Sequence, residues 1–413
     1  MKNSFLSEMN SRGFVNQCTD SDKLDKISKE KQIKAYIGFD STAPSLHVGS
    51  LMQIMVLRLL QKHGHQPIVL LGGGTTLIGD PSGKDATRKI LSKKDIEKNI
   101  AGIKKVFEKL LFTKNKRTKP IFVDNYNWLG KLKYIDFLRD IGRHFTINKM
   151  LTFDSVKLRL DREQSLSYTE FNYMILQAYD FYQLFKNNNC ILQMGGSDQW
   201  GNIINGIELI RRILKKEAFG LTTPLITLSS GAKMGKTEKG AVWLDKKKFT
   251  PYEYWQFWRN TADQDVKLFL KYFTEINIDE LNDRISNEKD INKLKILLAN
   301  ETTKILHGSK AAKDSEDTAK TTFIKGGIGK NIPEKKMSKE IILKGINIID
   351  LLSQNNLTSS KSDARRILKN RGIKINDKVI VDENKIIDLS DFSNSNFIKI
   401  SVGKKTHLKV SII

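Results

Sequence analysis

The sequence predicts an α/β protein with a parallel sheet, followed by an α-helical region and a small α+β unit. Two observations support this fold class. Through the first 245 or so residues, short apolar runs alternate with helix-like segments, which is typical of a parallel sheet covered on both faces. From about Thr250, aromatic residues cluster and helical periodicity dominates to about Lys313.

The first region contains four strand-like runs, each followed by a glycine-containing turn or a helical pattern. The expected strands are Lys34–Phe39, Pro67–Leu71, Pro120–Val123 and Cys190–Met194, and the expected helices are Gly49–His63, Ser167–Asp180 and Ile203–Leu214. Ligands of such sheets bind outside the carboxyl ends of the strands.

The rest of the chain divides by composition. We expect a first domain over residues 1–246, a helical domain over 247–325, a linker over 326–340 and a final unit over 341–413. The linker is predicted because its residues are rich in Gly, Pro and Lys. In the final unit, an expected helix at Ile349–Leu352 leads to the segment Leu357–Leu368, and strands are expected at Ile373–Ile375 and Val379–Val381.

Charge indicates a polyanionic partner. The 413 residues hold 70 Lys and Arg against 46 Asp and Glu, a net charge of +24, and nucleic acid is the first candidate for such a surplus. A lysine-rich host composition is the alternative. Cys18 and Cys190 have no ligand spacing, so neither a zinc site nor a disulfide framework is expected. With no signal peptide and no membrane-length apolar run, the sequence predicts a soluble, cytoplasmic protein.

The segment Tyr36–Ser50 is the most informative motif. It is an apolar strand, a turn and the start of a helix, and it places Thr42, His47 and Gly49 where backbone N–H groups are free. Helix N-termini bind phosphates well. Together with Lys233-Met-Gly-Lys-Thr237, this motif indicates an enzyme that activates its substrate with ATP.

Two further segments carry polar groups at the same sheet. Tyr173, Gln177 and Asp180 share one face of a largely apolar helix; they require either internal hydrogen-bond partners or a polar ligand, because unpaired buried polar groups cost about 1–3 kcal/mol each. In Gly195–Asn202, Asp198 can accept hydrogen bonds from ribose hydroxyls, although this segment alone is an ordinary strand–turn–helix junction.

Two motifs are ambiguous. The loop Gly72–Lys84 is not a P-loop, since Ile78 and Asp85 stand where Gly and Ser or Thr are required. It can still be a phosphate-binding loop of another kind, with Lys84 and Arg88 as cations.

The segment Lys336-Met-Ser-Lys-Glu340 resembles a lysine-rich catalytic loop. It falls in the expected linker, so the copy at Lys233–Thr237, placed after a strand and turn at Pro224–Gly231, is the expected functional one.

In combination and order, these motifs resemble the class I aminoacyl-tRNA synthetases, and among them the bacterial tyrosyl-tRNA synthetases. The motifs are Tyr36–Ser50, Gly79-Asp80-Pro81, Tyr173–Asp180, Gly195–Asn202 and Lys233–Thr237. The resemblance implies a Rossmann-like catalytic domain with a dimer-interface insertion at about 125–150, an anticodon-side helical domain and an S4-like RNA-binding domain. It also implies the reaction: tyrosine and ATP form tyrosyl-adenylate, and tyrosine then moves to tRNA(Tyr).

By matching position, the resemblance also implies roles for single residues. Around tyrosine it places Tyr36 and Asp180 at the phenol OH, Asp80, Tyr173 and Gln177 at the ammonium group, Gln199 at the carboxylate side, and Asp40 in the same pocket. Around ATP it places Thr42 and His47 at the phosphates, Gly49 at the adenine, Gly196 and Asp198 at the ribose, Gly38 and Ser50 nearby, and Lys233, Lys236 and Thr237 over the pyrophosphate, with Lys84 and Arg88 as helpers.

The chain departs from the family pattern at Ser50, where a second histidine is usual. The resemblance implies Mg²⁺ with the ATP, no organic cofactor, no dedicated metal ligands and a homodimer. For RNA it implies Lys361, Arg365 and Arg366, whose alternative is a solvated helix face. Two other functions stay open: a tryptophanyl-tRNA synthetase, and a non-catalytic RNA-binding protein with a degenerate synthetase body.

Overall fold

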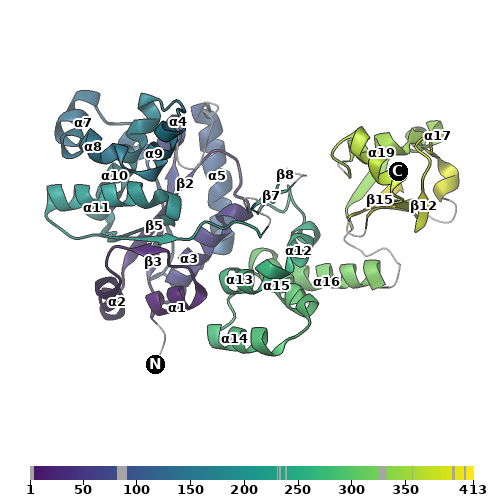
Figure 1. Cartoon of the computed structure of the whole chain (residues 1–413), viewed down its shortest axis with the longest axis horizontal. Coiled ribbons are helices and arrows are strands. Elements are labelled where there is room, and N and C mark those ends of the chain that lie inside the picture. Colours follow the sequence, from purple (N-terminus) through teal and green to yellow (C-terminus); the bar gives the residue numbers. More distant parts are fainter. Residues whose placement is uncertain are drawn as a thin grey trace. The chain divides into compact units, whose positions relative to one another are not determined.

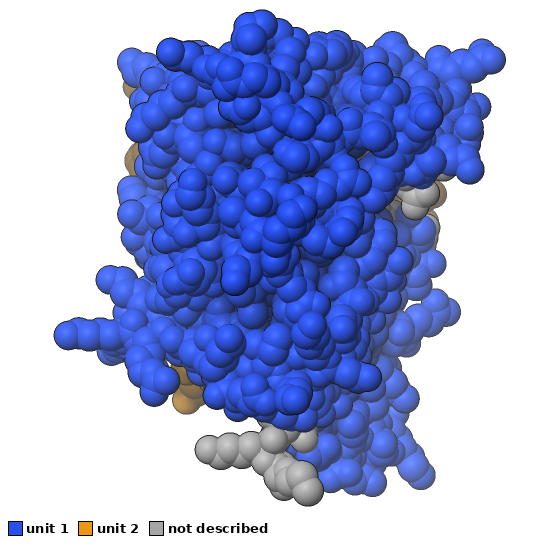
Figure 2. Space-filling model, turned by 90° about the vertical axis from the view of Figure 1, so that its left-hand side faces the viewer, with its two compact units in different colours: residues 1–235, 243–248, 262–294 blue, residues 236–242, 249–261, 295–413 orange. Residues whose placement is uncertain are grey.

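The structure is a computed structural model of the chain that describes residues 4–80, 91–229, 231, 234–237, 240–324, 332–355, 357–392, 396–403 and 406–413. The chain forms two compact units, coloured separately in Figure 2. The first contains residues 1–235, 243–248 and 262–294, and the second contains 236–242, 249–261 and 295–413.

A six-stranded sheet organises the first unit, in the order β1-β6-β5-β2-β3-β4. The strands are β1 (Gln17–Cys18), β2 (Lys34–Asp40), β3 (Gln66–Gly72), β4 (Ile121–Asp124), β5 (Leu192–Gly196) and β6 (Phe219–Thr223). All neighbours pair in parallel except β1, which is antiparallel to β6. The α/β fold class and the four predicted strands are thus confirmed.

Helices connect the parallel strands and lie against the sheet (Figure 1). The main ones are α3 (Leu51–Lys62), α5 (Lys93–Leu110), α10 (Tyr168–Asn188) and α11 (Trp200–Leu214). Helices α3 and α5 connect β2 to β3 and β3 to β4, whereas α10 precedes β5 and α11 connects β5 to β6 on the other side of β2. Right-handed crossovers therefore put the two pairs of helices on opposite faces of the sheet. The strand order therefore reverses between β2 and β5, which is where open α/β sheets bind ligands.

Helix α10 begins as its sequence predicts. Ser167 accepts a hydrogen bond from the backbone of Glu170 and the Glu170 carboxylate accepts one from the backbone of Ser167, a complete capping box. The helix ends at Asn189 in a left-handed conformation, and its apolar side packs on the sheet with Tyr36, Phe181 and Leu184 in one core. This packing fixes which face of α10 meets the ends of the strands.

Short helices complete the first unit. They are α1 (Phe5–Arg12), α2 (Ser21–Glu30), α4 (Thr75–Ile78), α6 (Tyr126–Leu129), α7 (Tyr134–Asp140), α8 (Ile147–Leu151), α9 (Asp154–Asp161), α13 (Asp263–Phe273) and α14 (Ile278–Asn287).

The region after residue 247 is helical, as expected. Its remaining helices are α12 (Pro251–Arg259), α15 (Ile291–His307) and α16 (Ser309–Ile324), preceded by the short strands β7 (Lys236–Thr237) and β8 (Gly240–Ala241). The two compact units share this region, since residues 262–294 belong to the first unit.

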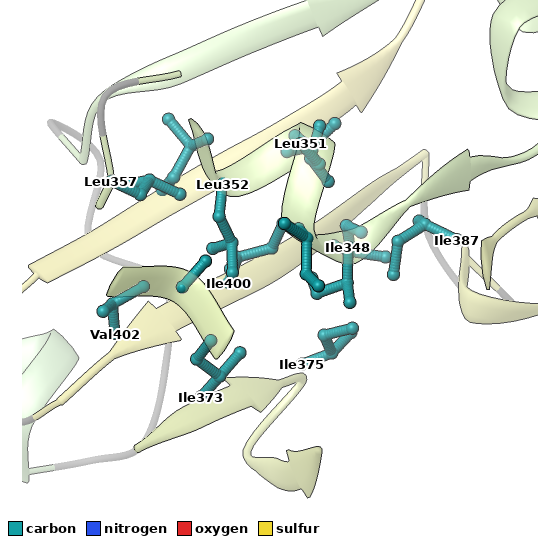
Figure 3. Packing of buried hydrophobic residues seen from close by; sticks show 14 of the residues in the cluster. Ile348, Leu351, Leu352, Leu357, Ile373, Ile375, Ile387, Ile400 and Val402 are labelled. Carbon is teal, nitrogen blue, oxygen red and sulfur yellow. The ribbon is translucent and has the colours of Figure 1, made fainter. Parts of the chain in front are cut away.

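The C-terminal part forms a five-stranded sheet in the order β12-β11-β14-β15-β9. Its elements are β9 (Glu334–Met337), α17 (Lys339–Lys344), α18 (Ile348–Gln354), α19 (Lys361–Lys369), β11 (Ile373–Ile375), β12 (Lys378–Ile380), β14 (Phe397–Val402) and β15 (Thr406–Ile412), with β10 (Ile346–Asn347) paired to β13 (Ile386–Ile387). Isoleucines and leucines from both helices and strands form its core (Figure 3).

Part of the segment expected as a linker is instead a strand. Residues 334–337 form β9, which pairs in parallel with β15, and Lys339 begins α17. The second lysine-rich motif, Lys336–Glu340, therefore lies in the C-terminal sheet and helix. Residues 325–331 lie outside the described part of the chain.

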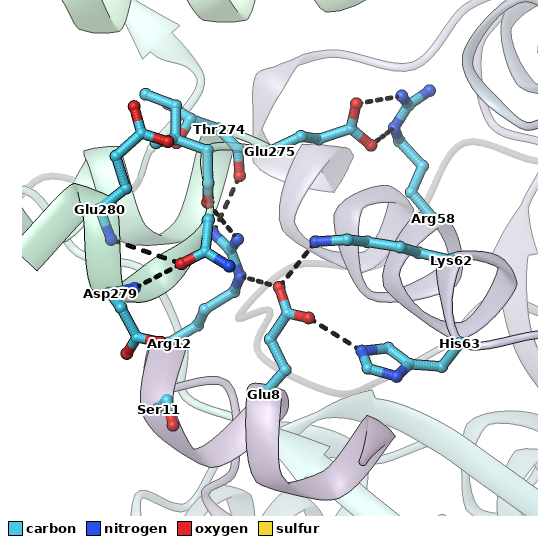
Figure 4. A network of polar contacts seen from close by, with 12 residues as sticks. Glu8, Ser11, Arg12, Arg58, Lys62, His63, Thr274, Glu275, Asp279 and Glu280 are labelled. Atoms are coloured by element: carbon cyan, nitrogen blue, oxygen red, sulfur yellow. Dashed lines mark hydrogen bonds and ion pairs between the residues drawn. The ribbon is translucent and has the colours of Figure 1, made fainter. Parts of the chain in front are cut away.

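A polar network ties the N-terminal helix α1 to α3 and to the end of α13 (Figure 4). Arg12, 3% exposed, donates to Glu8 and to the carbonyls of Lys271, Thr274 and Ile276, at 2.7–3.0 Å. Glu8 also accepts from Lys62 at 3.1 Å and contacts His63 at 2.8 Å. Beside it, Arg58 makes two hydrogen bonds to Glu275. These charged contacts add to apolar packing at the same place, where the ring of Phe14 stacks on that of Tyr272.

No helix in the described part of the chain is both long and apolar enough to cross a membrane.

Candidate active site

A cleft of about 330 Å³ opens at the carboxyl ends of β2, β3 and β5, where the strand order reverses. Twelve of the sequence-predicted residues line it: Tyr36, Gly38, Asp40, Gly49, Ser50, Asp80, Tyr173, Gln177, Asp180, Gly196, Asp198 and Gln199. They come from four of the motifs recognised in the sequence, so these twelve predicted residues converge on one cavity.

A buried carboxylate marks the deep end of the cleft. Asp180, 1% exposed, accepts hydrogen bonds from Nδ2 of Asn125 at 2.9 Å and Nε1 of Trp128 at 2.7 Å. Burial raises the pKa of Asp180 to about 7 despite these two donors, and the nearby carboxylates of Asp40 and Asp124 add to the rise. Tyr36 is 1% exposed, and its hydroxyl has no hydrogen-bond partner among the described residues. An unpaired hydroxyl beside a carboxylate suits a ligand with its own hydroxyl.

A second group of polar side chains surrounds Asp40 and Asp80. Oδ1 of Asp40 accepts from Thr75 at 3.2 Å and from the hydroxyl of Tyr173 at 3.3 Å. Gln199 donates to Asp80 at 3.1 Å. These carboxylates provide acceptors for an ammonium group.

Asn202 orients two of the predicted glutamines. Its Nδ2 donates to Oε1 of Gln177 at 3.0 Å and to Oε1 of Gln199 at 3.1 Å. Because both amide oxygens are bound in this way, the amide N–H groups of the two glutamines are left to other partners, and Gln199 uses one for Asp80. The helical stripe seen in the sequence therefore has internal partners as well as a cavity in front of it.

The two nucleotide motifs touch each other. Nδ1 of His47 accepts from the backbone N–H of Gly49 at 3.0 Å. A Cβ atom on Gly49 would lie 2.6 Å from the His47 ring and 3.0 Å from the carbonyl oxygen of Met234, and one on Gly235 would lie 2.8 Å from the Gly49 nitrogen. Only glycine permits this approach. The backbone of His47 also forms an isolated antiparallel bridge with Trp243, and the two side-chain rings pack edge to face.

Several predicted residues lie elsewhere or outside the described part of the chain. Lys84, Arg88 and Lys233 are outside it, and Lys236 and Thr237 are described only as backbone of β7. Thr42 is exposed in the connection after β2. The strand expected at Pro224–Gly231 is instead β6, which ends at Thr223, because Pro224 has no N–H to continue the ladder.

Sequence reasoning missed three residues of the site: Asn125, Trp128 and Asn202. Asn125 follows β4 directly, so its place at the carboxyl end of a predicted strand is a signal that could have found it. Trp128 lies on the short helix α6, and Asn202 is one turn into α11. Their contacts depend on how those helices pack, which no local pattern specifies.

No group of three or more His, Cys, Asp or Glu side chains that could hold a metal ion occurs among the described residues.

The predicted RNA-binding cations lie on or beside α19, and each has an acidic neighbour. Lys361 contacts Asp350 at 2.7 Å, Arg365 contacts Glu383 at 3.7 Å, and Arg366 contacts Asp363 at 2.6 Å. All three are more than half exposed, so these pairs are weak and can open for a phosphate.

Comparison with known proteins gives two family matches. Residues 28–324 match the family described as tRNA synthetases class I (W and Y), and residues 324–410 match the tyrosine–tRNA ligase SYY-like C-terminal domain. Among similar sequences, a tyrosine–tRNA ligase of Pelagibacter ubique is 60% identical over 413 residues, the whole of both chains. A tyrosine–tRNA ligase of Rickettsia massiliae is 53% identical over 99% of this chain and all of its own length.

Solved structures agree in fold. A C-terminally truncated mitochondrial tyrosyl-tRNA synthetase of Aspergillus nidulans aligns with a TM-score of 0.69 and 30% identity, covering 78% of this chain and 95% of its own. A tyrosyl-tRNA synthetase of Archaeoglobus fulgidus, solved with L-tyrosine, aligns with a TM-score of 0.56 and 18% identity over 75% of this chain and 99% of its own.

Proposed function

This chain belongs to the tyrosine–tRNA ligases of the class I tRNA synthetases, and we propose that the cleft at the carboxyl ends of β2, β3 and β5 is where it joins L-tyrosine to ATP. The product is tyrosyl-adenylate, with release of pyrophosphate. The tyrosyl group then passes to the 3′ end of tRNA(Tyr).

The pairing of Tyr36 with Asp180 carries the proposal. A tyrosine phenol between them donates its O–H to the Asp180 carboxylate and accepts from the Tyr36 hydroxyl, which has no partner among the described residues. Asn125 and Trp128 hold the carboxylate in place from behind. Phenylalanine leaves these groups unpaired and an indole offers no oxygen to Tyr36, so the pocket favours a phenol.

The amino acid's charged end fits the other polar group of the cleft. Asp80, Tyr173 and Gln177 take the ammonium group, Asp40 lies in the same pocket, and Gln199 lies at the carboxylate side. Asn202 acts through Gln177 and Gln199, so we class it as a positioning residue.

On the nucleotide side, Gly38, Gly49 and Ser50 lie at the adenosine, and Gly196 and Asp198 lie at the ribose. Thr42 and His47 serve the phosphates. The imidazole Nδ1 of His47 already accepts from Gly49, so the neutral ring presents an Nε2–H donor. Lys233, Lys236 and Thr237 clamp the departing pyrophosphate, with Lys84 and Arg88 as helpers; for these five the proposal rests on the sequence motifs.

The reaction requires no general base. The tyrosine carboxylate is ionised at neutral pH and attacks the α-phosphorus of ATP directly, so the bond to the β-phosphate oxygen breaks as the new carboxyl–phosphate bond forms. The residues of the cleft accelerate this step by holding the two reactants in line and by placing donors at the phosphate oxygens, where negative charge develops.

Mg²⁺ is expected to arrive with ATP. Magnesium in such sites is held mainly by phosphate oxygens and water with one or two protein oxygens, so it needs no acidic cluster, and none occurs among the described residues.

Pyrophosphate exchange tests the function. We expect the purified chain to exchange labelled pyrophosphate into ATP when tyrosine is present and to show only background exchange with tryptophan, with phenylalanine or without an amino acid. Tryptophan-driven exchange would identify the other branch of the matched family. Absence of exchange with every amino acid, from a folded chain, would support a non-catalytic RNA-binding protein.

The pKa of Asp180 predicts how tyrosine binding depends on pH. Its pKa in the folded chain is about 7, above its ordinary value of 3.8, because burial penalises the charged form. The fold therefore loses stability as pH rises from about 4 to about 7, because the buried carboxyl must ionise. Tyrosine binds the ionised form and so offsets this loss. We expect the tyrosine Kd to rise as pH falls below about 7, approaching tenfold per pH unit. Fluorescence titration from pH 5.5 to 8 measures it; an Asp180→Asn control should show no such slope, and a flat native profile would contradict the assignment.

The C-terminal part is proposed to hold the tRNA. Lys361, Arg365 and Arg366 on α19 are exposed cations on a small, separately packed core, suited to tracking a phosphate backbone. A chain ending at Ile324, before β9, should keep tyrosine-dependent exchange within about twofold and lose tRNA charging, because every residue that the proposal assigns to adenylate formation precedes Ile324. Aminoacylation with labelled tyrosine measures charging, and equal loss of both activities would argue against a separate RNA module.

We also propose that the chain forms a homodimer through the insertion at about 125–150. Helices α7 and α8 of this insertion, and the start of α10 beyond it, carry large apolar side chains that are mostly exposed: Tyr134, Ile135, Ile147 and Tyr168, at 61–71%. Such a patch is typical of an interface. The cytoplasmic location expected from the sequence remains a prediction.

A further inference from the structure

A second cavity lies at the opposite end of the central sheet. It has about 330 Å³ and is lined by Ser28–Gln32, His63–His65, Asn115, Arg117 and Thr118. These residues belong to the connections that lead into β2, β3 and β4, so the cavity, here termed the amino-end basin, sits at the amino ends of strands whose carboxyl ends form the reaction cleft. Strands of seven residues separate the two by about 20 Å.

The walls of the basin are held by the protein's own hydrogen bonds. Nε2 of Gln32 donates to the carbonyls of Gly64 at 2.7 Å and Arg117 at 2.9 Å, which links all three connections. Gln61 donates to the carbonyls of Phe112 and Thr118 at 2.8 and 2.6 Å. The basin is therefore a built concavity between fixed loops.

The lining of the basin carries more positive than negative charge. Lys29, Lys31 and Arg117 line it against a single acid, Glu30. Lys29 is paired with Asp25 at 2.5 Å, whereas Lys31 and Arg117 are exposed and have no ion-pair partner among the described residues. Lys114, Lys116 and Lys119 continue the exposed positive surface along the connection that contains Arg117.

A buried histidine supplies a donor inside the basin. His65 is 4% exposed and lines the cavity. Its Nδ1 accepts from the backbone N–H of Ile33 at 3.4 Å. Burial lowers the pKa of His65 to about 4 and the neighbouring His63 adds to this, so the ring is neutral at pH 7 and carries its proton on Nε2, for which no described residue provides an acceptor. His63 itself contacts Glu8.

We propose that the amino-end basin is a binding site for phosphate groups, held by Lys31, Arg117 and the Nε2–H of His65. Phosphoryl oxygens match this donor set, because arginine binds them through paired N–H groups and lysine as a point charge. A cavity of about 330 Å³ holds more than one phosphate. The ligand is therefore a polyphosphate or a phosphodiester chain. A polyphosphate would reach the basin as free pyrophosphate or nucleotide. A phosphodiester chain would reach it as the RNA backbone, which the three flanking lysines would contact beyond the basin.

The test first occupies the reaction cleft with a non-reactive tyrosyl-adenylate analogue, so that only other sites remain. Inorganic pyrophosphate is then titrated by calorimetry into the full chain, into the double variant Lys31→Ala/Arg117→Ala, and into a control, Lys105→Ala, which removes an exposed lysine of α5. A second arm measures binding of tRNA(Tyr) by anisotropy at several salt concentrations. Tyrosine-dependent exchange and a thermal melt are recorded on each variant.

We expect the double variant to weaken one of the two probes at least about tenfold, as loss of charged hydrogen bonds does, while Lys105→Ala, exchange and melting stay unchanged. Weaker pyrophosphate binding assigns the site to small phosphates. Weaker tRNA binding, with a salt slope reduced by about 1–2, assigns it to the RNA backbone. If both probes bind all three chains equally, the proposal is wrong. Failure of exchange in the native chain would instead count against the proposed function, since exchange uses the other end of the sheet.

Discussion

Replacing Asp180 with alanine is expected to reduce kcat/KM for tyrosine in pyrophosphate exchange by about 10- to 150-fold. The change removes the acceptor of the phenol O–H, and a hydrogen bond to a charged group contributes about 1.5–3 kcal/mol. It also leaves Nδ2 of Asn125 and Nε1 of Trp128 without the carboxylate that both now bind. The loss falls on tyrosine more than on phenylalanine, because phenylalanine never made the contact.

Discrimination between the two amino acids therefore separates a specific role from general damage. In Asp180→Ala the ratio of kcat/KM for tyrosine to that for phenylalanine should shrink toward one, whereas KM for ATP should change little. Asp22→Ala, an exposed aspartate of α2, is the matched control and should leave every parameter unchanged. If Asp180→Ala melts normally and still rejects phenylalanine as the native chain does, the phenol pocket is misassigned.

The sequence predicted the parts of this site that local pattern specifies. The apolar run of β2 and the capping box of α10 place Tyr36, Tyr173, Gln177 and Asp180 at one end of a sheet. Parallel topology brings the ends of such strands together, which is why residues more than a hundred positions apart could be assigned to one cleft. Family resemblance then supplied their individual roles.

The contacts that orient these residues could not be predicted in the same way. Trp128 reaches Asp180 from α6, and Met234 lies against Gly49 although nearly two hundred residues separate them. Both contacts are products of tertiary packing. The strand β9 was missed for a related reason: Glu334–Met337 is polar and short, and only its pairing with β15 at the sheet edge stabilises it as a strand.

The polar network at α1 predicts the largest stability effect outside the cleft. Arg12 is almost fully buried and satisfies three carbonyls of residues 271–276 as well as Glu8. Arg12→Ala leaves these carbonyls unsatisfied and removes one of the donors to the buried Glu8 carboxylate. Removing one partner of a buried ion pair costs about 3–5 kcal/mol. We expect the melting transition of the first unit to fall by roughly 10 °C. Lys29→Ala, which breaks an exposed pair with Asp25 on the adjacent helix, should lower it by no more than roughly 2 °C.

The dependence of stability on acid pH shows whether the charges of this network, and not only its packing, stabilise the fold. Burial pushes the pKa of Glu8 up, but hydrogen bonds from His63, Arg12 and Lys62 outweigh it and hold the pKa at about 2, below the ordinary 4.5. The ionised carboxylate therefore stabilises the fold fully above about pH 4.5, and this contribution, about 3 kcal/mol, is lost as pH falls toward 2. Glu8→Gln should weaken the fold at pH 7 and make it less sensitive to acid between pH 4.5 and 2.5. Urea unfolding at several pH values measures both; equal acid sensitivity of native and variant chains would show that Glu8 is not the group that titrates.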